Sequence, residues 1–215
     1  MTILAAQFWQ QLKLARRTFR HAVIPHSSIY NHHYYATHVE EGAASSAAIM
    51  SRSIVEWAKP KTVIDVGCGT GALLDAFRNL GCDVRGLEYS EAGLDYCKRR
   101  LLPVTKFNIE KDHIQGNAQY DLVVSFEVAE HLRSWCADRY VKLLCGLSPR
   151  VVISAATPGQ GGRGHLNEQS PSYWIRKFEI CGLRFDEQSS KHFANEWKAA
   201  GTSHWYCDNV MAYIR

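Results

Sequence analysis

The stretch VIDVGCGTG, residues Val63 to Gly71, decides the fold of this chain. The β-branched run at its start predicts a buried strand, which ends at three alternating glycines, Gly67, Gly69 and Gly71. The sequence ALLDAFRNL follows at once and predicts a helix. In such a strand, turn and helix unit, backbone amides at the helix N-terminus face a ligand, and glycine has no Cβ to keep the ligand away. We therefore predict that this turn holds a cofactor.

The spacing of the glycines indicates which cofactor. A dinucleotide fold needs G-x-G-x-x-G, whereas here the third glycine comes one residue early and Asp65 precedes the first glycine by two. The D-x-G-x-G-x-G pattern resembles motif I of the class I S-adenosylmethionine-dependent methyltransferases. The resemblance implies that S-adenosylmethionine is the cofactor and that these residues bind it: Asp65, Gly67, Cys68, Gly69 and Gly71.

Two further strands are expected to complete the cofactor site. The run DVRGLE predicts a strand that ends at Glu88, and a carboxylate there, about 20 residues past the glycines, can accept hydrogen bonds from both ribose hydroxyls. Tyr89 follows it. The next strand, in PVTKFNIEKD, ends near Asn108 and Ile109, where the family usually has an acid for the adenine amino group. An asparagine carbonyl can accept from that amine without a charge.

The fourth strand is predicted within YDLVVSFEVAEHL, where Leu122 to Val124 form an apolar run typical of a parallel sheet interior. Chemistry tends to lie at the carboxyl ends of such strands. We expect Phe126 and Glu127 to border the cofactor, and Glu130 and His131 to open the next helix beside the methyl group. This E-V-x-E-H element is common in one broad branch of the family.

From about residue 34 to 215 the chain resembles a class I methyltransferase. The resemblance implies an α/β fold, a Rossmann-like doubly wound seven-stranded sheet that is mostly parallel with the last strand antiparallel. The expected elements are a helix over 43–57, a fifth strand over 150–154, a helix in SPSYWIRKFEICG, and last strands in LRFDEQ and WYCDNVMAYIR. The predicted division is 1–45, an N-terminal amphipathic helix with a basic face (3–23) and an aromatic flap, and 46–215, the methyltransferase domain.

A glycine-rich loop, AATPGQGGRGHLNEQSP, follows the fifth strand at the edge where a substrate must lie. With the next helix it resembles a segment of little-characterised bacterial and phage methyltransferases related to glycan and secondary-metabolite enzymes. The resemblance implies a small-molecule or glycan acceptor gripped by His165 and Asn167, with Tyr173 or Trp174 stacking on it. Packing under the loop is the alternative for the two aromatic residues.

Catalysis can be assigned in more than one way. His131 and His165 are the two candidate catalytic residues: one takes the acceptor's proton and the other orients the substrate, because an imidazole suits a base at neutral pH. Alternatively, Glu127, Glu130 and these histidines bind Mg²⁺ or Mn²⁺, an arrangement similar to that of metal-dependent RNA 2′-O-methyltransferases and, in part, of quinone-biosynthesis O-methyltransferases. The metal is the less favoured assignment. A third alternative is an inactive cofactor-binding partner subunit.

Composition limits the remaining possibilities. The chain has 215 residues, 46% of them hydrophobic and 21% charged, which is ordinary for one globular domain. No apolar run approaches the roughly 20 residues of a membrane span. Seven scattered cysteines without a CxxC pair indicate reduced thiols and a cytoplasmic location. The net charge of +4 and the absence of a basic and aromatic stripe in the core make nucleic acid an unlikely partner. The oligomeric state is left open.

Overall fold

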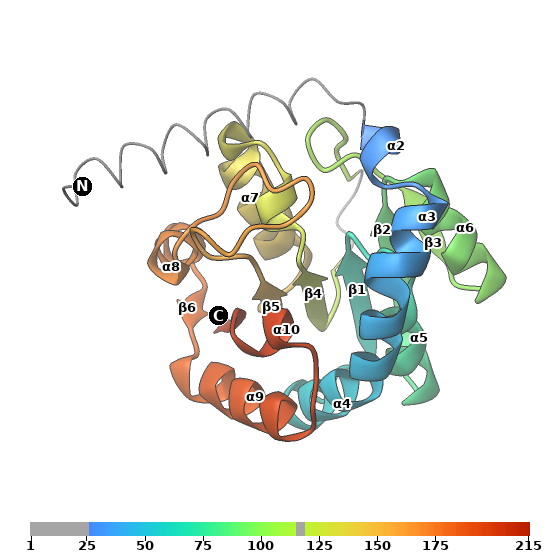
Figure 1. The fold of residues 1–215 in the computed structure, drawn as a ribbon. Helices are drawn as coiled ribbons and strands as arrows, with labels where there is room; N and C mark the ends of the chain where they lie inside the picture. Colours follow the sequence, from blue (N-terminus) through green and yellow to red (C-terminus); the bar gives the residue numbers. More distant parts are fainter. Residues whose placement is uncertain (1–25, 115–118) are drawn as a thin grey trace.

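The computed structural model describes residues 26–114 and 119–215. The amphipathic helix predicted over residues 3–23 lies outside this part of the chain. The described residues build a seven-stranded sheet in the order β3-β2-β1-β4-β5-β7-β6 (Figure 1). The strands are β1 Thr62–Val66, β2 Asp83–Glu88, β3 Val104–Lys106, β4 Leu122–Phe126, β5 Arg150–Ser154, β6 Arg184–Phe185 and β7 Val210–Ile214.

The pairing of the strands confirms the predicted architecture. Strands β3, β2, β1, β4 and β5 pair in parallel, while β7 pairs antiparallel with both β5 and β6. Parallel strands bring their carboxyl ends to one edge of the sheet, where α/β proteins bind ligands. The register places Phe126 beside Ser154, and Ser154 beside Val210 at the start of β7.

Helices cover both faces of the sheet, and each face has its own apolar core. Helices α4 (Glu40–Ala58), α5 (Ala72–Asn79) and α9 (Glu187–Ala199) supply Ile54, Phe77 and Trp197 to one core. Helices α7 (Ala137–Leu147) and α8 (Pro171–Ile180) supply Leu144 and Phe178 to the other. Helix α6 (Glu91–Arg99) packs beside β3 at the sheet edge. Covering on both faces explains why β1, β4 and β5 are mostly apolar and almost completely buried.

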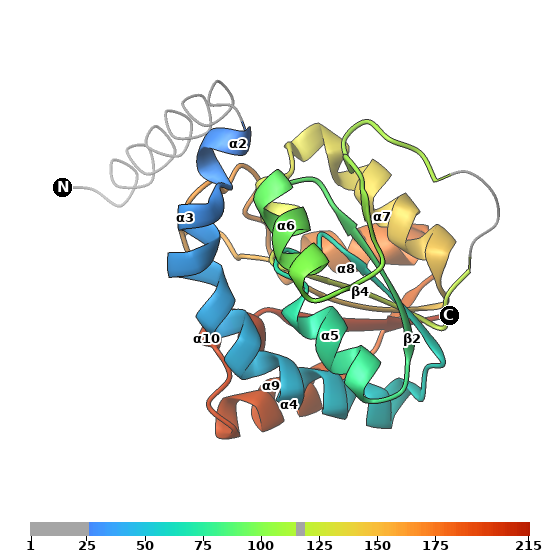
Figure 2. The same cartoon turned by 90° about the vertical axis from the view of Figure 1, so that its right-hand side faces the viewer.

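The segment before the sheet runs along one side of the molecule. Short helices α2 (His26–Ile29) and α3 (His32–Tyr34) and a π-helical turn η1 (Tyr35–Val39) lead directly into α4 (Figure 2). Helix α4 confirms the helix predicted over 43–57 and begins three residues earlier. The predicted boundary between residues 45 and 46 falls inside this helix, and the division of the chain stays a prediction.

Two predictions about local structure are wrong. Glu130 and His131 do not open a long helix: they lie in a 3₁₀ turn, η2 (Ala129–His131), followed by another, η3 (Ser134–Cys136), before α7 begins. The reason is that Leu132 and Arg133 have extended backbone, with ψ of 151° and 142°, which interrupts the helical conformation after His131. The last strand begins at Val210, not in the preceding WYC, because residues 204–207 form helix α10 (His204–Cys207).

Helix α9 was not expected from the sequence. Its buried side chains are Ser190, Phe193 and Trp197, so only two large apolar residues mark its inner face. It begins at Asp186, whose carboxylate accepts the backbone N–H of Ser189 as an N-cap. Among the described helices, none has the length and apolar character that crossing a membrane requires.

Candidate active site

The glycine turn after β1 has a conformation that other residues rarely adopt. Gly67, Gly69 and Gly71 have φ of 81°, 56° and 75°. A Cβ on Gly67 would lie 2.5 Å from Val128 Cγ2, and one on Gly71 would lie 2.6 Å from Leu102 Cδ1. Both the dihedral angles and the close neighbours therefore require glycine, and the turn can offer its backbone to a ligand.

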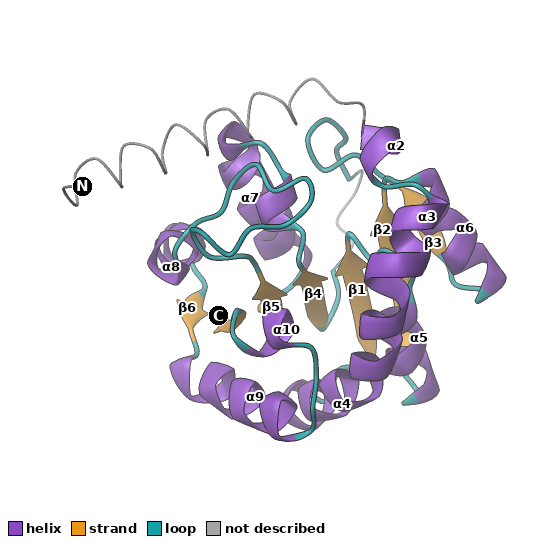
Figure 3. Ribbon diagram, in the orientation of Figure 1, coloured by secondary structure: helices purple, strands orange, loops and turns teal. Residues whose placement is uncertain are grey.

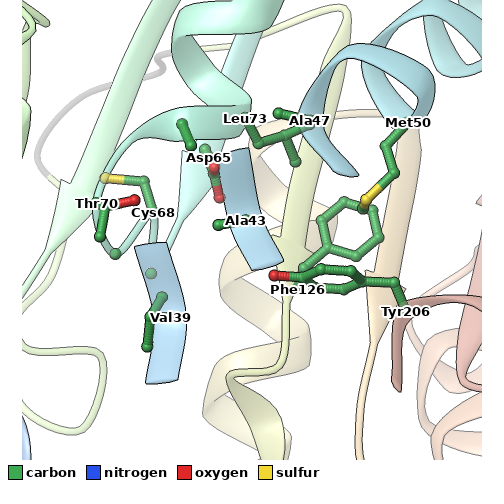
Figure 4. Close-up of a pocket in the computed structure, with 13 residues that line it drawn as sticks. Val39, Ala43, Ala47, Met50, Asp65, Cys68, Thr70, Leu73, Phe126 and Tyr206 are labelled. Atoms are coloured by element: carbon green, nitrogen blue, oxygen red, sulfur yellow. The ribbon is translucent and has the colours of Figure 1, made fainter. Parts of the chain in front are cut away.

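A cavity opens to solvent beside this turn, with a space of about 480 Å³ between its lining residues and the surface. Figure 4 shows Met50, Phe126 and Tyr206 gathered on one side of it, and Cys68 and Thr70 on the other. The acid that lines it is Asp65, at 4% exposure. Burial, and then the charge of Glu88, raises the pKa of Asp65 to about 8. A positively charged ligand beside Asp65 would stabilise its ionised form.

Glu88 lies at the end of β2, as predicted, and holds the glycine turn. Its carboxylate accepts the backbone N–H groups of Gly69 at 2.7 Å, Tyr89 at 2.8 Å and Ser90 at 2.7 Å. Burial raises the pKa of Glu88, and these three hydrogen bonds oppose that rise. A carboxylate has about four acceptor positions, so Glu88 keeps capacity for a hydroxyl donor such as a ribose. Tyr35 covers the turn, with its ring 3.6 Å from where a Cβ on Gly69 would lie.

The other residues predicted to bind the cofactor lie beyond the neighbouring strands, and Asn108 and Ile109 are the ones expected near its adenine. Tyr89 is 40% exposed directly after β2, and Ile109 is buried in the loop that follows β3. Asn108 Oδ1 accepts the backbone N–H of Glu110, while the backbone N–H of Asn108 donates to Asp112. The Asn108 side chain thus stabilises its own loop, and a second lone pair on Oδ1 is left for a ligand amine.

Two buried carboxyl groups follow β4. The backbone N–H of Glu127 donates to the Ser154 carbonyl and hydroxyl on β5, at 3.2 and 3.0 Å. Burial raises the pKa of Glu127 to about 7. Glu130 is fully buried, and burial together with the Glu127 charge raises its pKa well above the usual range. Neither carboxyl oxygen of Glu130 has a well-aligned hydrogen-bond partner among the described residues, although the Glu127 carboxyl and the backbone N–H of Ala156 lie near enough to influence its pKa. Such polar groups are costly to bury and mark a place where a ligand can pair with them.

The structure brings the two predicted catalytic histidines together. The ring centroids of His131 and His165 lie 4.9 Å apart at an interplanar angle of 81°. His131 Nδ1 is hydrogen-bonded to the Tyr30 hydroxyl at 2.7 Å, and His165 Nδ1 to Glu168 Oε1 at 2.8 Å. One candidate ligand atom from each of Glu130, His131 and His165 lies within 4.8 Å of the other two.

The glycine-rich loop between β5 and α8 runs above the carboxyl end of β5 (Figure 3). The backbone N–H groups of Leu166 and Asn167 both donate to the carbonyl of Glu130, at 2.7 and 2.9 Å. Gln160 Oε1 accepts from Asn209 Nδ2 just before β7. Hydrogen bonds therefore hold the loop both to the backbone at Glu130 and to the start of the last strand.

The predicted acceptor-binding residues differ in their placement. Asn167 is 3% exposed, with Oδ1 accepting from Gln169 and no partner for Nδ2 in the described chain. Trp174 is fully buried in the core against Tyr140, so its ring presents no face to a ligand here, and packing explains it. Tyr173 lies edge-on to Trp174, with the Lys177 ammonium 4.8 Å from its ring centroid.

Sequence reasoning missed three residues of the site. Tyr206 lines the cavity from α10, a segment predicted to be strand. Met50 lines it from α4, where a methionine within a helix gives no signal of its own. Glu168 pairs with His165 three residues away, a spacing that the sequence displays but that is common in loops without such a pair.

A comparison of the sequence with known protein families identifies the family of this chain. A family model described as a methyltransferase domain matches residues 35–201, most of the chain. The chain belongs to the class I S-adenosylmethionine-dependent methyltransferases. This confirms the family that motif I, Glu88 and the E-V-x-E-H element indicated.

The most similar relatives of this methyltransferase differ in how far they match. It is 34% identical over 79 residues to the ubiquinone biosynthesis O-methyltransferase of Acinetobacter baylyi, which is 34% of this chain and 33% of that protein. The match thus spans about a third of the length of the curated relatives. Among solved structures, the CcbJ methyltransferase of Streptomyces caelestis has a TM-score of 0.62 at 14% identity, with 79% of this chain and 89% of that one covered. The sugar N-methyltransferase KedS8 of a Streptoalloteichus species has a TM-score of 0.61 at 15% identity, covering 85% and 91%. These two likenesses show the fold.

Proposed function

We propose that this protein transfers a methyl group from S-adenosylmethionine to a hydroxyl or amine of a small polar acceptor, such as a glycan or secondary metabolite. The family membership supports the cofactor. The similar proteins include an O-methyltransferase of ubiquinone biosynthesis and a sugar N-methyltransferase, which supports an oxygen or nitrogen acceptor. The seven free thiols of the described chain support a reducing, cytoplasmic location.

The residues around the cavity fit this cofactor. The glycine turn offers close backbone approach, Glu88 can accept from a ribose hydroxyl, and Asp65 favours positive charge. When bound, S-adenosylmethionine supplies a methyl group on a positively charged sulfur. Phe126 and Tyr206 line the cavity, and the adjacent rings of His131 and His165 would orient the acceptor and take its proton.

One observation supports this proposal most directly: Tyr206 connects the two halves of the site. It lines the cofactor cavity beside Asp65. Its pKa is raised by burial and by the charges of Glu127, Asp65 and Glu130, so all three carboxyls lie within electrostatic reach of its hydroxyl. Donor cavity and carboxyl cluster are therefore neighbours, as a direct transfer between two bound molecules requires.

The test combines binding with turnover. Calorimetry should detect S-adenosylmethionine and its demethylated product, with NAD as a ligand that should not bind. Mass spectrometry should then detect a labelled methyl group on one member of a panel holding a catechol, an amino sugar, a glycan and an RNA oligonucleotide. The variant Asp121→Asn is a matched control, because Asp121 accepts two backbone N–H groups at the opposite end of β1. Absence of cofactor binding would refute the proposal; binding without turnover across the panel would favour the inactive partner subunit.

A second candidate is a metal-dependent transfer to vicinal hydroxyls, and one observation favours it. Glu130, His131 and His165 place three ligand atoms within 4.8 Å of one another, and neither Glu130 oxygen has a well-aligned hydrogen-bond partner among the described residues. Mixed carboxylate and imidazole ligands suit Mn²⁺ or Mg²⁺. Titration with Mn²⁺, followed by the loss of the free-ion EPR signal, should show binding that Glu130→Gln weakens and Asp121→Asn leaves unchanged. Equal affinity in all three proteins would exclude this candidate.

A further inference from the structure

We infer that Glu168 is a positioning residue that holds His165 as the proton acceptor of the reaction, so that the two histidines have different tasks. This inference rests on the proposed function. His165 and Glu168 side chains are 8% and 4% exposed, and their contact of 2.8 Å joins Nδ1 to Oε1. The pair is therefore shielded from water, where a hydrogen bond to a carboxylate is strong.

The other partners of Glu168 show that its carboxyl group acts as an acceptor. Oε1 also accepts the backbone N–H of Gly161, and Oε2 accepts that of Gly159, both at 2.9 Å. A backbone N–H only donates, so both oxygens are already used as acceptors, as in an ionised carboxylate. His165 Nδ1 must then carry the proton in this contact. In the neutral ring the lone pair lies on Nε2, the atom that a proton acceptor uses.

His131 is held differently. Its Nδ1 is bonded at 2.7 Å to the hydroxyl of Tyr30, and a phenol can either donate or accept. Burial raises the pKa of Tyr30 far above its usual range, so the hydroxyl keeps its proton. This contact leaves both forms of the His131 ring possible, whereas a carboxylate permits only one form of the neutral His165 ring. The structure therefore assigns the base role to His165 and substrate orientation to His131.

The His165 ring packs closely against Gly162 of the same loop. A Cβ on Gly162 would lie 2.0 Å from Nε2 and 2.4 Å from Cε1 of that ring. Gly162 has no positive φ, so an alanine there suits the backbone and conflicts with the imidazole of His165. The residue at 162 is thus glycine because the ring occupies that space.

The chemical step balances with these assignments. The acceptor's oxygen or nitrogen forms a bond to the methyl carbon while the carbon–sulfur bond breaks. The electron pair of the broken carbon–sulfur bond stays on sulfur. His165 Nε2 takes the proton of the acceptor and later releases it to water. Glu168 keeps its negative charge throughout and stabilises the charged ring, without receiving the proton itself.

The direct test is a two-bond ¹H–¹⁵N NMR spectrum of the imidazole rings at about pH 8.5, roughly two units above the usual imidazole pKa. The His165 signal is assigned with a His165→Ala variant. We expect the form with the proton on Nδ1. In Glu168→Gln only one acceptor oxygen remains for two backbone N–H groups, so the amide NH₂ turns to the ring and the form with the proton on Nε2 grows. A wild-type ring with its proton on Nε2, or a form that Glu168→Gln does not change, would overturn the inference.

Kinetics with the acceptor that the panel reveals give a second test. Loss of a general base lowers kcat by about 10²- to 10⁴-fold, so His165→Ala and Glu168→Gln should both fall in this range. A residue that acts only through His165 adds no further loss in the double variant, whereas a merely structural role multiplies the two losses. Multiplied losses would contradict the inference.

Two more variants separate folding from positioning. Gly162→Ala should displace the His165 ring and lower kcat, with affinity for S-adenosylmethionine unchanged. Asp121→Asn removes a charge from a carboxylate that also binds two backbone N–H groups, and should leave the NMR form and kcat unchanged. If no acceptor is methylated, the proposed function fails, while the NMR result still confirms or refutes the pairing of Glu168 with His165.

Discussion

Replacing Asp65 with asparagine should make the protein more stable at alkaline pH. Asp65 is buried beside the glycine turn, and burial together with the Glu88 charge raises its pKa to about 8 from an ordinary value of 3.8. The folded state therefore keeps a proton that the unfolded chain loses above pH 4. When folding raises the pKa of a carboxyl group, the free energy of unfolding falls as the pH rises from the pKa of that group in the unfolded chain to its pKa in the folded protein.

The size of the effect follows from these two pKa values. Each pH unit between them costs at most about 1.4 kcal/mol. From pH 5 to pH 8 the wild-type protein should lose ~3–4 kcal/mol of stability through Asp65, and above pH 8 the loss should level off. Asparagine does not titrate, so the stability difference between Asp65→Asn and wild type should grow by this amount over the same interval.

Denaturant unfolding at pH 5, 6, 7, 8 and 9 measures the difference directly. Asp121→Asn is the control, because backbone N–H groups of Thr62 and Lys61 lower the pKa of Asp121. When folding lowers the pKa of a carboxyl group, the group stabilises the fold at every pH above its pKa in the unfolded chain. This stabilisation is lost only in acid, as the pH falls to the pKa in the folded protein. The control difference should therefore stay flat from pH 5 to 9. A flat difference for Asp65→Asn as well would refute the electrostatic account of the cavity.

Three further predictions concern the glycine turn and the core. Gly67→Ala should destabilise the fold by about 1–3 kcal/mol, because φ at this position is 81° and the new Cβ would collide with Val128. Adding Val128→Ala should restore part of this stability, as measured by denaturant unfolding. A further loss of stability in the double variant would contradict the contact. Glu88→Gln should weaken S-adenosylmethionine binding by about tenfold in calorimetry, since one acceptor oxygen is lost; an unchanged Kd would contradict its role. Trp197→Phe should cost about 1–2 kcal/mol, because the buried Nε1 donor to Ser53 Oγ disappears; an unchanged denaturation midpoint would contradict it.

Local sequence signals predicted the strand, turn and helix around the three glycines well. The glycine turn, the strand before it and the helix after it are contiguous, so their pattern and their contacts coincide. Glu88 lies at the predicted strand end because a parallel strand that follows a crossover helix returns to the same edge.

The acceptor half depends on contacts between distant parts of the chain, and the sequence did not reveal them. Tyr30 meets His131 across 101 positions, and neither residue has a pattern that names the other. Tyr206 lines the cavity from the short helix α10, whose apolar residues had the pattern of a strand. Trp174 is assigned to the core only by its complete burial, since an aromatic residue on a helix suits a core and a ligand equally well.

Carboxyl groups with raised pKa values lie on both the cofactor side and the acceptor side of the site. Asp65, Glu127 and Glu130 are buried around Tyr206, and burial raises the pKa of each of them. Carboxyls in this condition release protons when positive charge arrives, because the ionised form is then stabilised. Binding of a sulfonium cofactor should therefore release up to one proton at neutral pH, seen by calorimetry in two buffers of different ionisation enthalpy. Asp65→Asn should lower that number if Asp65 faces the positive charge, whereas an unchanged number would place the charge at the other carboxyls.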